Sequence, residues 1–363
     1  MKISLFIAGL GNGGAERVFI KLFKYFKKMG YDVDLVCATQ KGGLVDNVDL
    51  DVKYLGASFG YLSFYRYYKY LNERKPDVVI ATLSSSIVTA AFIKFFFMNT
   101  PYKLICRIAN VYQEPNSLIG QINLVFQKYA LKISDGIIAN SNATLDSVSN
   151  ILKIEATNMK SQIISNPVLE DDFLIKYKKP KNNDKKTNKR IIIIGRYVPQ
   201  KRIDHAVKAF FLVQKKISNC KLTIVGDGPG RQKILHLINQ YQIMDKVKLI
   251  DFCPDVPRLL GEFDCMISTS KFEGFGNVLI EGLAFCDNLI AYKSIGGASE
   301  LLIGTNAILI EDGNINKLAD AMIDILSQDF HHRTASKKYL SNFTVSKVGE
   351  EYLSFIADVA NEN

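Results

Sequence analysis

The chain has 363 residues, of which 48% are hydrophobic and 23% are charged, and its formal net charge is +10. This composition excludes a disordered or fibrous protein, and no apolar run reaches the roughly 18 residues of a transmembrane helix. The charge leaves nucleic acid, an anionic membrane and phosphorylated substrates open as partners. Because the basic residues are spread along the chain, with one dense run at Lys176–Arg190, we expect no nucleic-acid binding.

The six cysteines form no CxxC pair and fall on predicted strands and loops. Such a distribution favours reduced thiols in a cytosolic protein and indicates no zinc site. The N-terminal apolar run Ile3–Ala8 is too short for a signal peptide and leads directly into glycines, so it predicts a first strand.

The first half of the chain alternates short apolar runs with amphipathic segments. In Ala15–Met29, for example, Val18, Leu22 and Phe26 share one face of a predicted helix. The runs predict buried parallel strands, and they are Lys2–Ala8, Val33–Ala38, Val78–Ala81, Leu104–Arg107 and Gly136–Ala139.

The alternation stops at Asn166-Pro-Val168 and restarts at Arg190, after a polar, lysine-rich stretch over Tyr177–Lys189. Further strands are predicted at Leu222–Val225, Val247–Ile250, Cys265–Ser268 and Asn288–Ala291. We therefore predict an α/β fold with two doubly wound, Rossmann-like domains facing each other across a cleft. The expected boundaries are 1–168 for the first domain, 169–189 for the linker, 190–344 for the second domain and 345–360 for a last helix.

A glycine-rich loop, Gly9–Arg17, follows the first predicted strand. Glycines let a ligand approach the backbone, and the start of the next helix presents free N–H groups. The loop matches a dinucleotide-binding fingerprint only weakly, because its spacing is imperfect and Asp34 lies inside the second strand. A tight strand–helix turn remains an alternative interpretation.

Two cations, Arg196 and Lys201, lie five residues apart on the loop that follows the first strand of the second domain. At the carboxyl end of a central strand, an Arg and a Lys can neutralise a diphosphate without a metal. Taken alone, such a pair on a loop is more often simply solvated.

Two glutamates, Glu273 and Glu281, lie on either side of a glycine-containing stretch. We expect Glu273 at the end of a loop and Glu281 about two turns into a helix that begins near Gly276. The N–H groups at that helix start suit an anion or a sugar hydroxyl, and the carboxylates suit hydroxyls of a ribose and a sugar. A glycosidase-like acid–base pair and a solvated helix face are the alternatives.

Together these motifs resemble the family 4 retaining glycosyltransferases of the GT-B architecture. The resemblance implies transfer of a sugar from a nucleotide diphosphate donor with retention, without a metal or a bound cofactor, with UDP expected first and GDP next. It extends from Gly11–Arg17 to the end of the chain and includes Ala139-Asn-Ser141, Ser165-Asn-Pro-Val168, Gly195-Arg196 with Lys201, Gly226-Asp-Gly-Pro229, Glu273 with Glu281, and Gly296-Gly-Ala-Ser-Glu300.

The resemblance also implies roles for these residues. Arg196 and Lys201 would bind the donor diphosphate and stabilise the leaving group, Glu273 would act on the donor sugar, and Glu281 would bind the ribose. Gly13 and Gly14 would lie near the acceptor and the diphosphate. The remaining donor contacts would come from the backbone of Gly274, Phe275, Gly276, Asn277 and Val278. The last helix would pack back on the first domain, which would bind the acceptor.

The chain departs from this family at one position of the first domain. Many members carry a histidine after a strand there, whereas all four histidines of this chain lie in the second domain. The corresponding stretch is Cys106–Asn110, and we expect Arg107 and Asn110 to replace the contacts of that histidine to the sugar.

Aromatic and basic residues are mixed in two stretches of the first domain, Phe59–Lys75 and Phe92–Lys103. Such helices can lie on an anionic membrane, although the aromatic residues are equally compatible with a core. Because similar family members dock on the inner leaflet, the resemblance implies a cytoplasmic, peripheral membrane enzyme of bacterial capsule or O-antigen assembly. Its acceptor would be a polyprenyl-diphosphate-linked sugar or another oligosaccharide.

Three other functions remain open from the sequence. An NAD-dependent oxidoreductase needs a ribose-binding acid after the second strand and a catalytic residue near the nicotinamide. A nucleotide-sugar epimerase needs acid–base carboxylates and usually a histidine in the cleft. A non-catalytic nucleic-acid-binding module would show a salt-dependent shift with random DNA.

Overall fold

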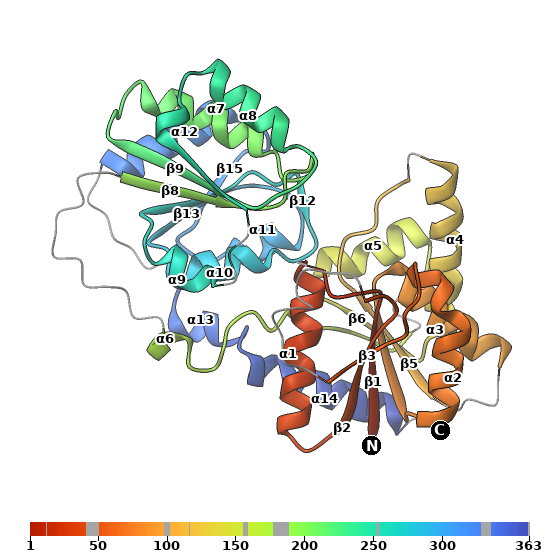
Figure 1. The fold of residues 1–363 in the computed structure, drawn as a ribbon. Helices are drawn as coiled ribbons and strands as arrows, with labels where there is room; N and C mark the ends of the chain where they lie inside the picture. Colours follow the sequence, from red (N-terminus) through yellow and green to blue (C-terminus); the bar gives the residue numbers. More distant parts are fainter. Residues whose placement is uncertain are drawn as a thin grey trace. The chain divides into compact units, whose positions relative to one another are not determined.

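The computed structural model describes residues 1–11, 13–40, 51–97, 102–115, 117–154, 159–176, 189–251, 253, 255–327 and 335–361. The chain divides into two compact units (Figure 1): unit 1 is Met1–Val168 with Phe343–Asn363, and unit 2 is Leu169–Asn342. Most of the expected linker, residues 177–188, lies outside the described residues. No described helix has the length and apolar character needed to cross a bilayer.

Unit 1 is built on a parallel sheet with the strand order β3-β2-β1-β4-β5-β6-β7. The strands are β1 (Lys2–Ile7), β2 (Asp32–Cys37), β3 (Val52–Tyr54), β4 (Val78–Thr82), β5 (Lys103–Ile108), β6 (Gly136–Ala139) and β7 (Ser161–Ile163). The helices are α1 (Gly14–Lys28), η2 (Gly60–Ser63, a 3₁₀ turn), α2 (Phe64–Arg74), α3 (Ser84–Phe96), α4 (Leu118–Ile133), α5 (Asn142–Leu152) and α14 (Val345–Ala360).

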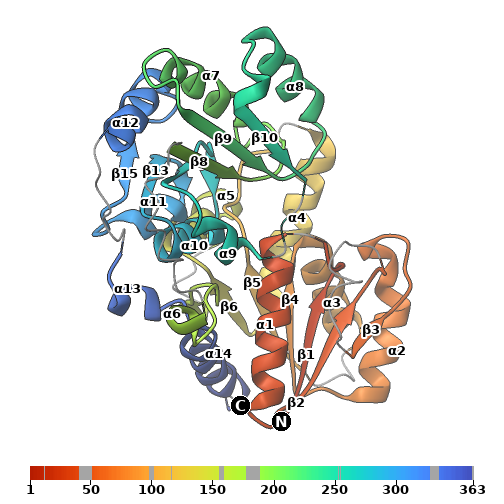
Figure 2. The same cartoon turned by 60° about the vertical axis from the view of Figure 1, so that its left-hand side comes forward.

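The strands of unit 1 bury both faces of the sheet, as their continuous apolar runs predict. Successive side chains point to opposite faces. Leu5 and Ile80 therefore belong to the core cluster beneath α1 and α14. Phe6 and Val79 belong to the cluster beneath α2, α3, α4 and α5. Figure 2 shows helices on both faces of this sheet.

Helix α14 belongs to unit 1 although it follows the whole of unit 2 in the chain. Val348, Tyr352 and Phe355 enter the same core cluster as α1. A Cβ atom built on Gly349 would lie 2.3 Å from the ring of Tyr25, so this helix pair approaches closely because position 349 has no side chain.

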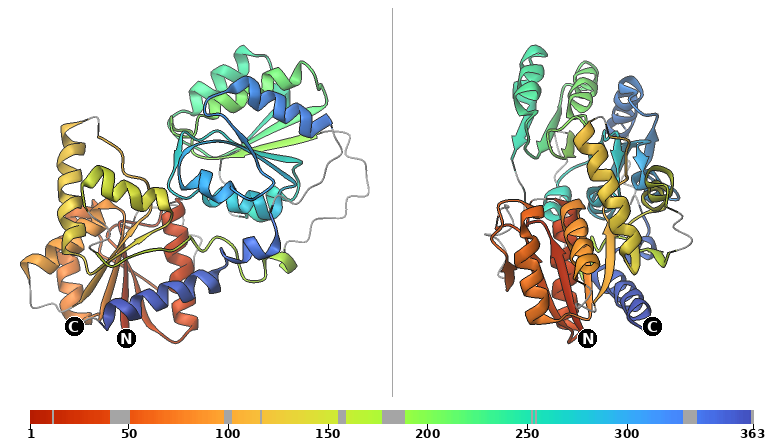
Figure 3. Two further views of the ribbon diagram at one scale, coloured as in Figure 1. Left: turned by 180° about the vertical axis from the view of Figure 1, so that it is seen from behind. Right: turned by 90° about the vertical axis from the view of Figure 1, so that its right-hand side faces the viewer.

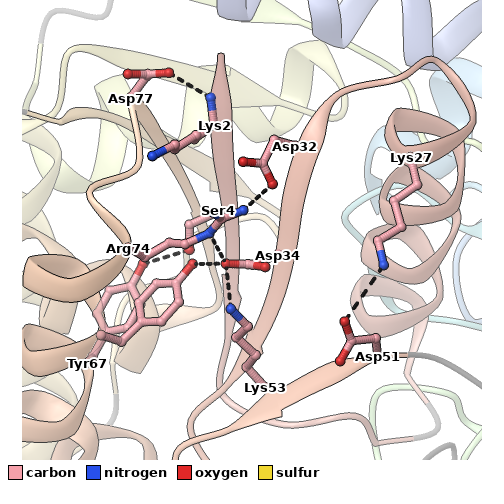
Figure 4. Close-up of polar contacts among 11 residues, drawn as sticks. Lys2, Ser4, Lys27, Asp32, Asp34, Asp51, Lys53, Tyr67, Arg74 and Asp77 are labelled. Atoms are coloured by element: carbon pink, nitrogen blue, oxygen red, sulfur yellow. Dashed lines mark hydrogen bonds and ion pairs between the residues drawn. The ribbon is translucent and has the colours of Figure 1, made fainter.

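The acidic residues at the start of β2 have structural partners (Figure 4). Asp34 accepts hydrogen bonds from Arg74 Nε at 2.7 Å, Tyr70 Oη at 2.9 Å and Lys53 Nζ at 3.1 Å. Arg74 also bonds to Asp32. Burial alone would raise the pKa of Asp34, but these hydrogen bonds outweigh it and the pKa is lowered. Asp34 therefore links β2 to α2 and β3. It is not a carboxylate at the end of a strand that could bind a ribose.

Unit 2 is built on a second parallel sheet, with the order β10-β9-β8-β11-β13-β15. Its strands are β8 (Lys189–Ile194), β9 (Cys220–Val225), β10 (Val247–Ile250), β11 (Cys265–Ser268), β13 (Asn288–Tyr292) and β15 (Ile308–Ile310), with a two-stranded sheet of β12 (Phe272–Glu273) and β14 (Ile295–Gly296). The helices are α6 (Phe173–Lys176), α7 (Ile203–Gln214), α8 (Arg231–Gln240), η4 (Met244–Lys246), α9 (Val256–Leu260), α10 (Asn277–Phe285), α11 (Gly297–Leu302), α12 (Ile315–Ser327) and α13 (Lys337–Ser341).

The larger sheet of unit 2 is also covered on both faces. Helices α7, α8 and α12 share one core cluster with alternate strand residues such as Ile193 and Ile267. Helix α10 covers the opposite face, where a Cβ atom at Gly282 would lie 2.6 Å from the sulfur of Met266 on β11. Every residue of the strand runs predicted in this half lies in an observed strand, and most of these residues are buried, except in the edge strand β10.

Candidate functional site

The centre of the unit 2 sheet is a topological switch point. Strands β8 and β11 pair with each other, and the chain then continues in opposite directions across the sheet, through β9 on one side and β13 on the other. Ligands of doubly wound sheets bind outside the carboxyl ends of the strands at such a point. The loops at residues 195–202 and 269–276 leave the sheet there and carry the residues expected to bind the donor.

The loop after β8 is held in place by the backbone of its neighbour. Tyr197 N donates to Asp227 O at 3.1 Å, and Gly230 N donates to Tyr197 O at 2.8 Å. Gly226 has φ +138°, and a Cβ atom there would lie 2.2 Å from the carbonyl oxygen of Gly195. The motif glycine at 226 is thus required by backbone packing.

Arg196 is exposed on this fixed loop. Its guanidinium forms no ion pair with any residue that the structure describes, in contrast to Arg202, which pairs with Asp312 at 2.7 Å. A fixed backbone with an exposed guanidinium is an arrangement that suits forked contacts to phosphate oxygens.

Lys201 is fixed at both its backbone and its side chain. Thr269 Oγ1, at the end of β11, donates to the carbonyl oxygen of Lys201 at 2.8 Å. The Lys201 ammonium bonds to Glu273 Oε1, and the two side chains are only 20% and 12% exposed. The ammonium expected to bind phosphate and the carboxylate expected to bind sugar therefore lie side by side at the switch point.

Glu273 lies on the short strand β12, which pairs with β14, rather than at the end of a loop. Its Oε1 also accepts a hydrogen bond from Ser270 Oγ at 2.7 Å. Gln200 Nε2 donates to the carbonyl oxygen of Phe272 at 2.8 Å and so joins the loop after β8 to β12. Sequence reasoning gave no role to Ser270 or Gln200, although the three-residue spacing from Ser270 to Glu273 is a local signal.

Helix α10 begins where a glycine-containing stretch was expected to bind anions. Gly276 precedes its first turn with φ +90°, a conformation that favours glycine. Asn277 and Val278 are half-buried in that first turn, whereas Gly274 and Phe275 are buried. The position expected for Glu281 needs correction, because the helix starts at Asn277 and Glu281 lies about one turn along it, not two.

The corresponding edge of unit 1 has a different character. Its switch point lies between β1 and β4, and the loop after β1 leads through Gly13 and Gly14 into α1. The carboxylate of Glu16 lies beside this loop, 2.4 Å from where a Cβ atom of Gly13 would be. A carboxylate in the first turn already interacts favourably with the helix dipole, so this helix start is less suited to a phosphate than that of α10. The side chain of Asn12 lies outside the described residues.

The structure corrects the role expected for Arg107. This side chain is 1% exposed and lies inside unit 1. Its guanidinium donates to Asn166 Oδ1 at 2.6 Å, Tyr352 Oη at 2.9 Å and Thr82 Oγ1 at 3.2 Å. The three partners lie far apart in the sequence. Arg107 therefore links β5 to α14 inside unit 1 and is not placed to contact a sugar. Asn110, by contrast, is exposed beyond the end of β5.

Metal-binding clusters and disulfides are missing from the described residues. No group of three or more His, Cys, Asp or Glu side chains lies close enough to hold a metal ion among them. All six cysteines are free, and five are buried. Burial raises the pKa of Cys37 and of Cys106 to about 12, so neither is a reactive thiolate.

Two doubly wound units, each with a switch point at its carboxyl edge, define the class of the protein as the GT-B type of α/β fold. The family profile described as Glycosyltransferase Family 4 matches residues 12–170, and the profile described as Glycosyl transferases group 1 matches residues 175–342. The chain belongs to the family 4 glycosyltransferases, and both the fold class and the family predicted from the sequence are confirmed.

Several relatives with curated names match the chain at low identity. The chain is 34% identical over 150 residues, 41% of its length, to the poly(glycerol-phosphate) alpha-glucosyltransferase of Bacillus subtilis. It is 23% identical over 371 residues, 98% of its length and 99% of the relative, to a Campylobacter jejuni enzyme. That enzyme is named N-acetylgalactosamine-N,N'-diacetylbacillosaminyl-diphospho-undecaprenol 4-alpha-N-acetylgalactosaminyltransferase. For the Bacillus subtilis relative and a Staphylococcus aureus ribitol-phosphate relative, the match spans only 22% and 46% of the relative's own length.

Solved structures agree with the fold over nearly the whole chain. The Anabaena protein HepE in complex with UDP and glucose matches with a TM-score of 0.83, covering 98% of this chain and 99% of HepE at 20% identity. Staphylococcus aureus TarM matches with a TM-score of 0.77 at 17% identity, covering 100% of this chain and 99% of TarM. At these identities the likeness establishes the fold.

Proposed function

We propose that the chain transfers a sugar from a UDP-sugar to a lipid-linked glycan, with retention of configuration and without a metal ion. The observation that carries this proposal is the cluster at the unit 2 switch point. There Glu273 accepts hydrogen bonds from both Lys201 and Ser270, and the exposed Arg196 lies on the same loop as Lys201. A donor needs both kinds of group, cations for its diphosphate and a carboxylate for its sugar hydroxyls.

The chemistry follows from where charge develops. As the bond to the anomeric carbon breaks, negative charge grows on the departing diphosphate. Arg196, Lys201 and the N-terminus of α10 are fixed positive groups at that edge, so they stabilise the transition state more than the bound donor. The acceptor hydroxyl would attack from the face of the leaving group and pass its proton to the departing phosphate, which makes retention the expected outcome.

The remaining donor contacts are assigned to α10 and its preceding loop. Glu281, half-buried in α10, would hold the ribose hydroxyls. The backbone of Gly274, Phe275, Gly276, Asn277 and Val278 would hold the phosphates and the sugar, since glycine at 276 leaves the helix start accessible. When the donor binds, its phosphate would form an ion pair with the Lys201 ammonium. Glu273 would then accept hydrogen bonds from the sugar hydroxyls in place of the one from Lys201.

The names of relatives support the choice of donor, linkage and acceptor. HepE was solved with UDP and with UDP-glucose, and several relatives are named for alpha-linked products. The Campylobacter jejuni relative is named for an acceptor carried on undecaprenol diphosphate. We therefore assign a polyprenyl-diphosphate-linked acceptor, a place at the inner face of the bacterial membrane, and a role in capsule or O-antigen assembly. Gly13, Gly14 and Asn110 at the carboxyl edge of unit 1 would meet the acceptor.

A thermal-shift panel of UDP, GDP, ADP and NAD, with and without EDTA, tests the donor site. We expect UDP to raise the melting temperature equally in both conditions, and Arg196→Ala to abolish the effect. Stabilisation by NAD alone, or only in the presence of a divalent metal, would contradict the proposal. Proton NMR of the product's anomeric coupling would then decide between retention and inversion.

A further inference from the structure

Helix α4 presents its apolar side to solvent. Ser117 caps its start by accepting a hydrogen bond from Gly120 N at 3.1 Å. Leu118 and Ile119 in the first turn are 71% and 81% exposed. The exposed apolar residues recur at helical spacing over about a third of the circumference, and they are Leu118, Ile119, Ile122, Val125, Phe126 and Tyr129.

The rotation of α4 about its own axis is fixed by its other side. Ala130 and Leu131 are buried against the unit 1 core. Ser84 Oγ, at the start of α3, donates to Gln127 Oε1 of α4 at 3.0 Å. An amphipathic helix normally buries its apolar stripe, so an anchored helix that turns this stripe outward calls for a partner.

The exposed stripe continues onto the neighbouring elements. Phe92 of α3 contacts Phe126 with 5.7 Å between ring centroids, and Tyr61 Oη of η2 donates to Asn123 Oδ1 at 2.8 Å. Figure 3 shows α4 next to α3. Further exposed aromatic residues lie at Tyr65 of α2 and Phe95 of α3.

We call this combined area of η2, α2, α3 and α4 the aromatic surface. Together with Phe59 and Phe97, which flank η2 and α3, it holds 13 of the 21 large hydrophobic residues exposed in the described part of the chain. Hydrophobic residues scattered singly over a surface need no explanation, but a contiguous patch marks an interaction site.

The charge around the aromatic surface is positive. In residues 59–75, 84–97 and 117–133 there are seven Lys or Arg residues and one acidic residue, Glu73. Three of these cations are paired with carboxylates: Lys69 with Glu73, Arg74 with Asp32 and Asp34, and Lys94 with Asp135. The excess of positive charge therefore comes from Arg66, Lys75, Lys128 and Lys132. Lys128 and Lys132 adjoin the stripe on α4 itself. Lysines at the border of an apolar face can keep their ammonium groups in the headgroup layer, where each is attracted to anionic lipid.

We propose that the aromatic surface is the face by which unit 1 lies on an anionic lipid bilayer. Tyrosines such as Tyr61, Tyr65 and Tyr129 suit the boundary between acyl chains and headgroups, because each has an apolar ring and a polar tip. A protein partner or a second copy would use the apolar residues but would not need the excess of positive charge.

The position of α4 relates the proposed membrane contact to the acceptor site. The chain leaves β5 at Ile108 and reaches α4 at Leu118, so the start of α4 lies towards the carboxyl edge of the sheet, where ligands of this fold bind. Docking through α4 would bring this edge to the headgroup layer that holds a lipid-linked acceptor. This inference deepens the proposed function and rests on its choice of acceptor.

A tryptophan reporter tests the contact directly. The chain contains no tryptophan, so Ile122→Trp places a single tryptophan in the aromatic surface. Ile303→Trp is the matched control, since Ile303 is 70% exposed in unit 2. With vesicles of phosphatidylcholine containing phosphatidylglycerol, we expect a blue shift and quenching by brominated acyl chains for the first variant alone. Equal responses, or no response at Ile122→Trp, would overturn the proposal.

Vesicle sedimentation of the full chain measures the strength of the contact. We expect Ile119→Asp with Ile122→Asp to lower the bound fraction on the order of tenfold or more, with no change for Ile303→Asp. Removing phosphatidylglycerol should weaken binding of the unmodified chain, and equal binding to neutral vesicles would contradict the electrostatic part.

Two controls separate this inference from other outcomes. Protection by UDP in thermal shift should be unchanged in the variant with Ile119→Asp and Ile122→Asp, because both residues lie in unit 1. If UDP protects but vesicles do not bind, the docking surface is wrong while the donor site stands. If sedimentation velocity shows a dimer that the same substitutions dissociate, the surface pairs two copies instead, and the proposal fails.

Discussion

The two units have the same type of strand order, and the first helix of each has an acidic residue in its first turn, but the loops before these helices differ in charge. In unit 1 the first turn of α1 holds the carboxylate of Glu16 beside the loop after β1. In unit 2 the loop after β8 presents Arg196 and Lys201 just before α7. Topology therefore decides where a ligand can bind in both sheets, whereas the loop residues decide which ligand it is. Unit 2 is suited to phosphate, and unit 1 to a group with less negative charge.

A second difference between the units is the burial of a basic side chain at the carboxyl edge of each sheet. Arg107 lies at the carboxyl end of β5 in unit 1, yet it is buried and bonded to Thr82, Asn166 and Tyr352. Lys201 at the carboxyl edge of unit 2 lies where solvent reaches it. We therefore expect mutations of Lys201 to affect catalysis, and mutations of Arg107 to affect stability.

The largest effect is expected for Lys201→Ala. Removing one fixed positive group from the leaving diphosphate should lower donor-dependent release of UDP by about 10²- to 10³-fold and abolish protection by UDP. Lys208→Ala is the matched control, because Lys208 lies on the same unit and pairs with Asp204 at 2.9 Å. Near-normal turnover in Lys201→Ala would show that unit 2 does not bind the donor in this way.

Arg107→Met should cost about 2–4 kcal/mol of unfolding free energy, because it leaves buried polar atoms of Asn166, Tyr352 and Thr82 without their donor. Urea denaturation measures this cost, and UDP should still protect the folded fraction. Arg66→Met, at an exposed position that bonds only to backbone carbonyls in the described residues, should cost far less. If Arg107→Met were as stable as the unmodified chain but inactive, Arg107 would instead contact the substrate, and the structural role would be wrong.

Asp34→Asn should cost about 1–2 kcal/mol at neutral pH. The folded-state pKa of Asp34 is lowered from its ordinary value of 3.8, so its contribution is complete above the unfolded-state pKa and is lost as the pH falls towards the folded-state value. Urea midpoints of the two proteins should therefore converge as the pH falls from about 5. A gap that stays constant or widens below that pH would contradict this role.

The smallest effect is expected for Ser270→Ala. Ser270 orients Glu273 through one hydrogen bond, and a bond of that kind contributes about 0.5–1.5 kcal/mol, or roughly a two- to twelvefold loss of kcat/KM. Ser270→Thr should restore part of the activity because it keeps the hydroxyl. Ser341→Ala removes a hydroxyl that bonds to a carbonyl in α13 and should change nothing measurable. Ser270→Ala with full activity would leave Glu273 positioned by Lys201 alone.

The sequence predicted the long buried strands well, because a strand covered on both faces is a continuous apolar run. It missed β3, β7, β12, β14 and β15, each of two or three residues, since so few positions carry no periodicity. That shortness also explains why Glu273 was expected in a loop.

The site residues could be placed only in part, for a similar reason. Arg196 and Lys201 follow a strand and the glycine directly after it, Gly195, a local pattern that the sequence displays. The partner of Arg107, Tyr352, lies 245 residues away, and no local pattern tells a buried arginine from an exposed one. The outward stripe of α4 was missed because an apolar helix face is normally a buried one.

The packing of α14 on unit 1 has a consequence for how the protein folds during synthesis. The core of unit 1 includes Val348, Tyr352 and Phe355, which the ribosome adds only after the whole of unit 2, residues 169–342. At roughly 5–20 residues per second, that delay is on the order of 10–35 s. During this time the apolar side of α1 has no covering helix, and the nascent chain would offer it to chaperones. A chain terminated directly after unit 2 would thus lack part of the core of unit 1, although unit 1 is synthesised first.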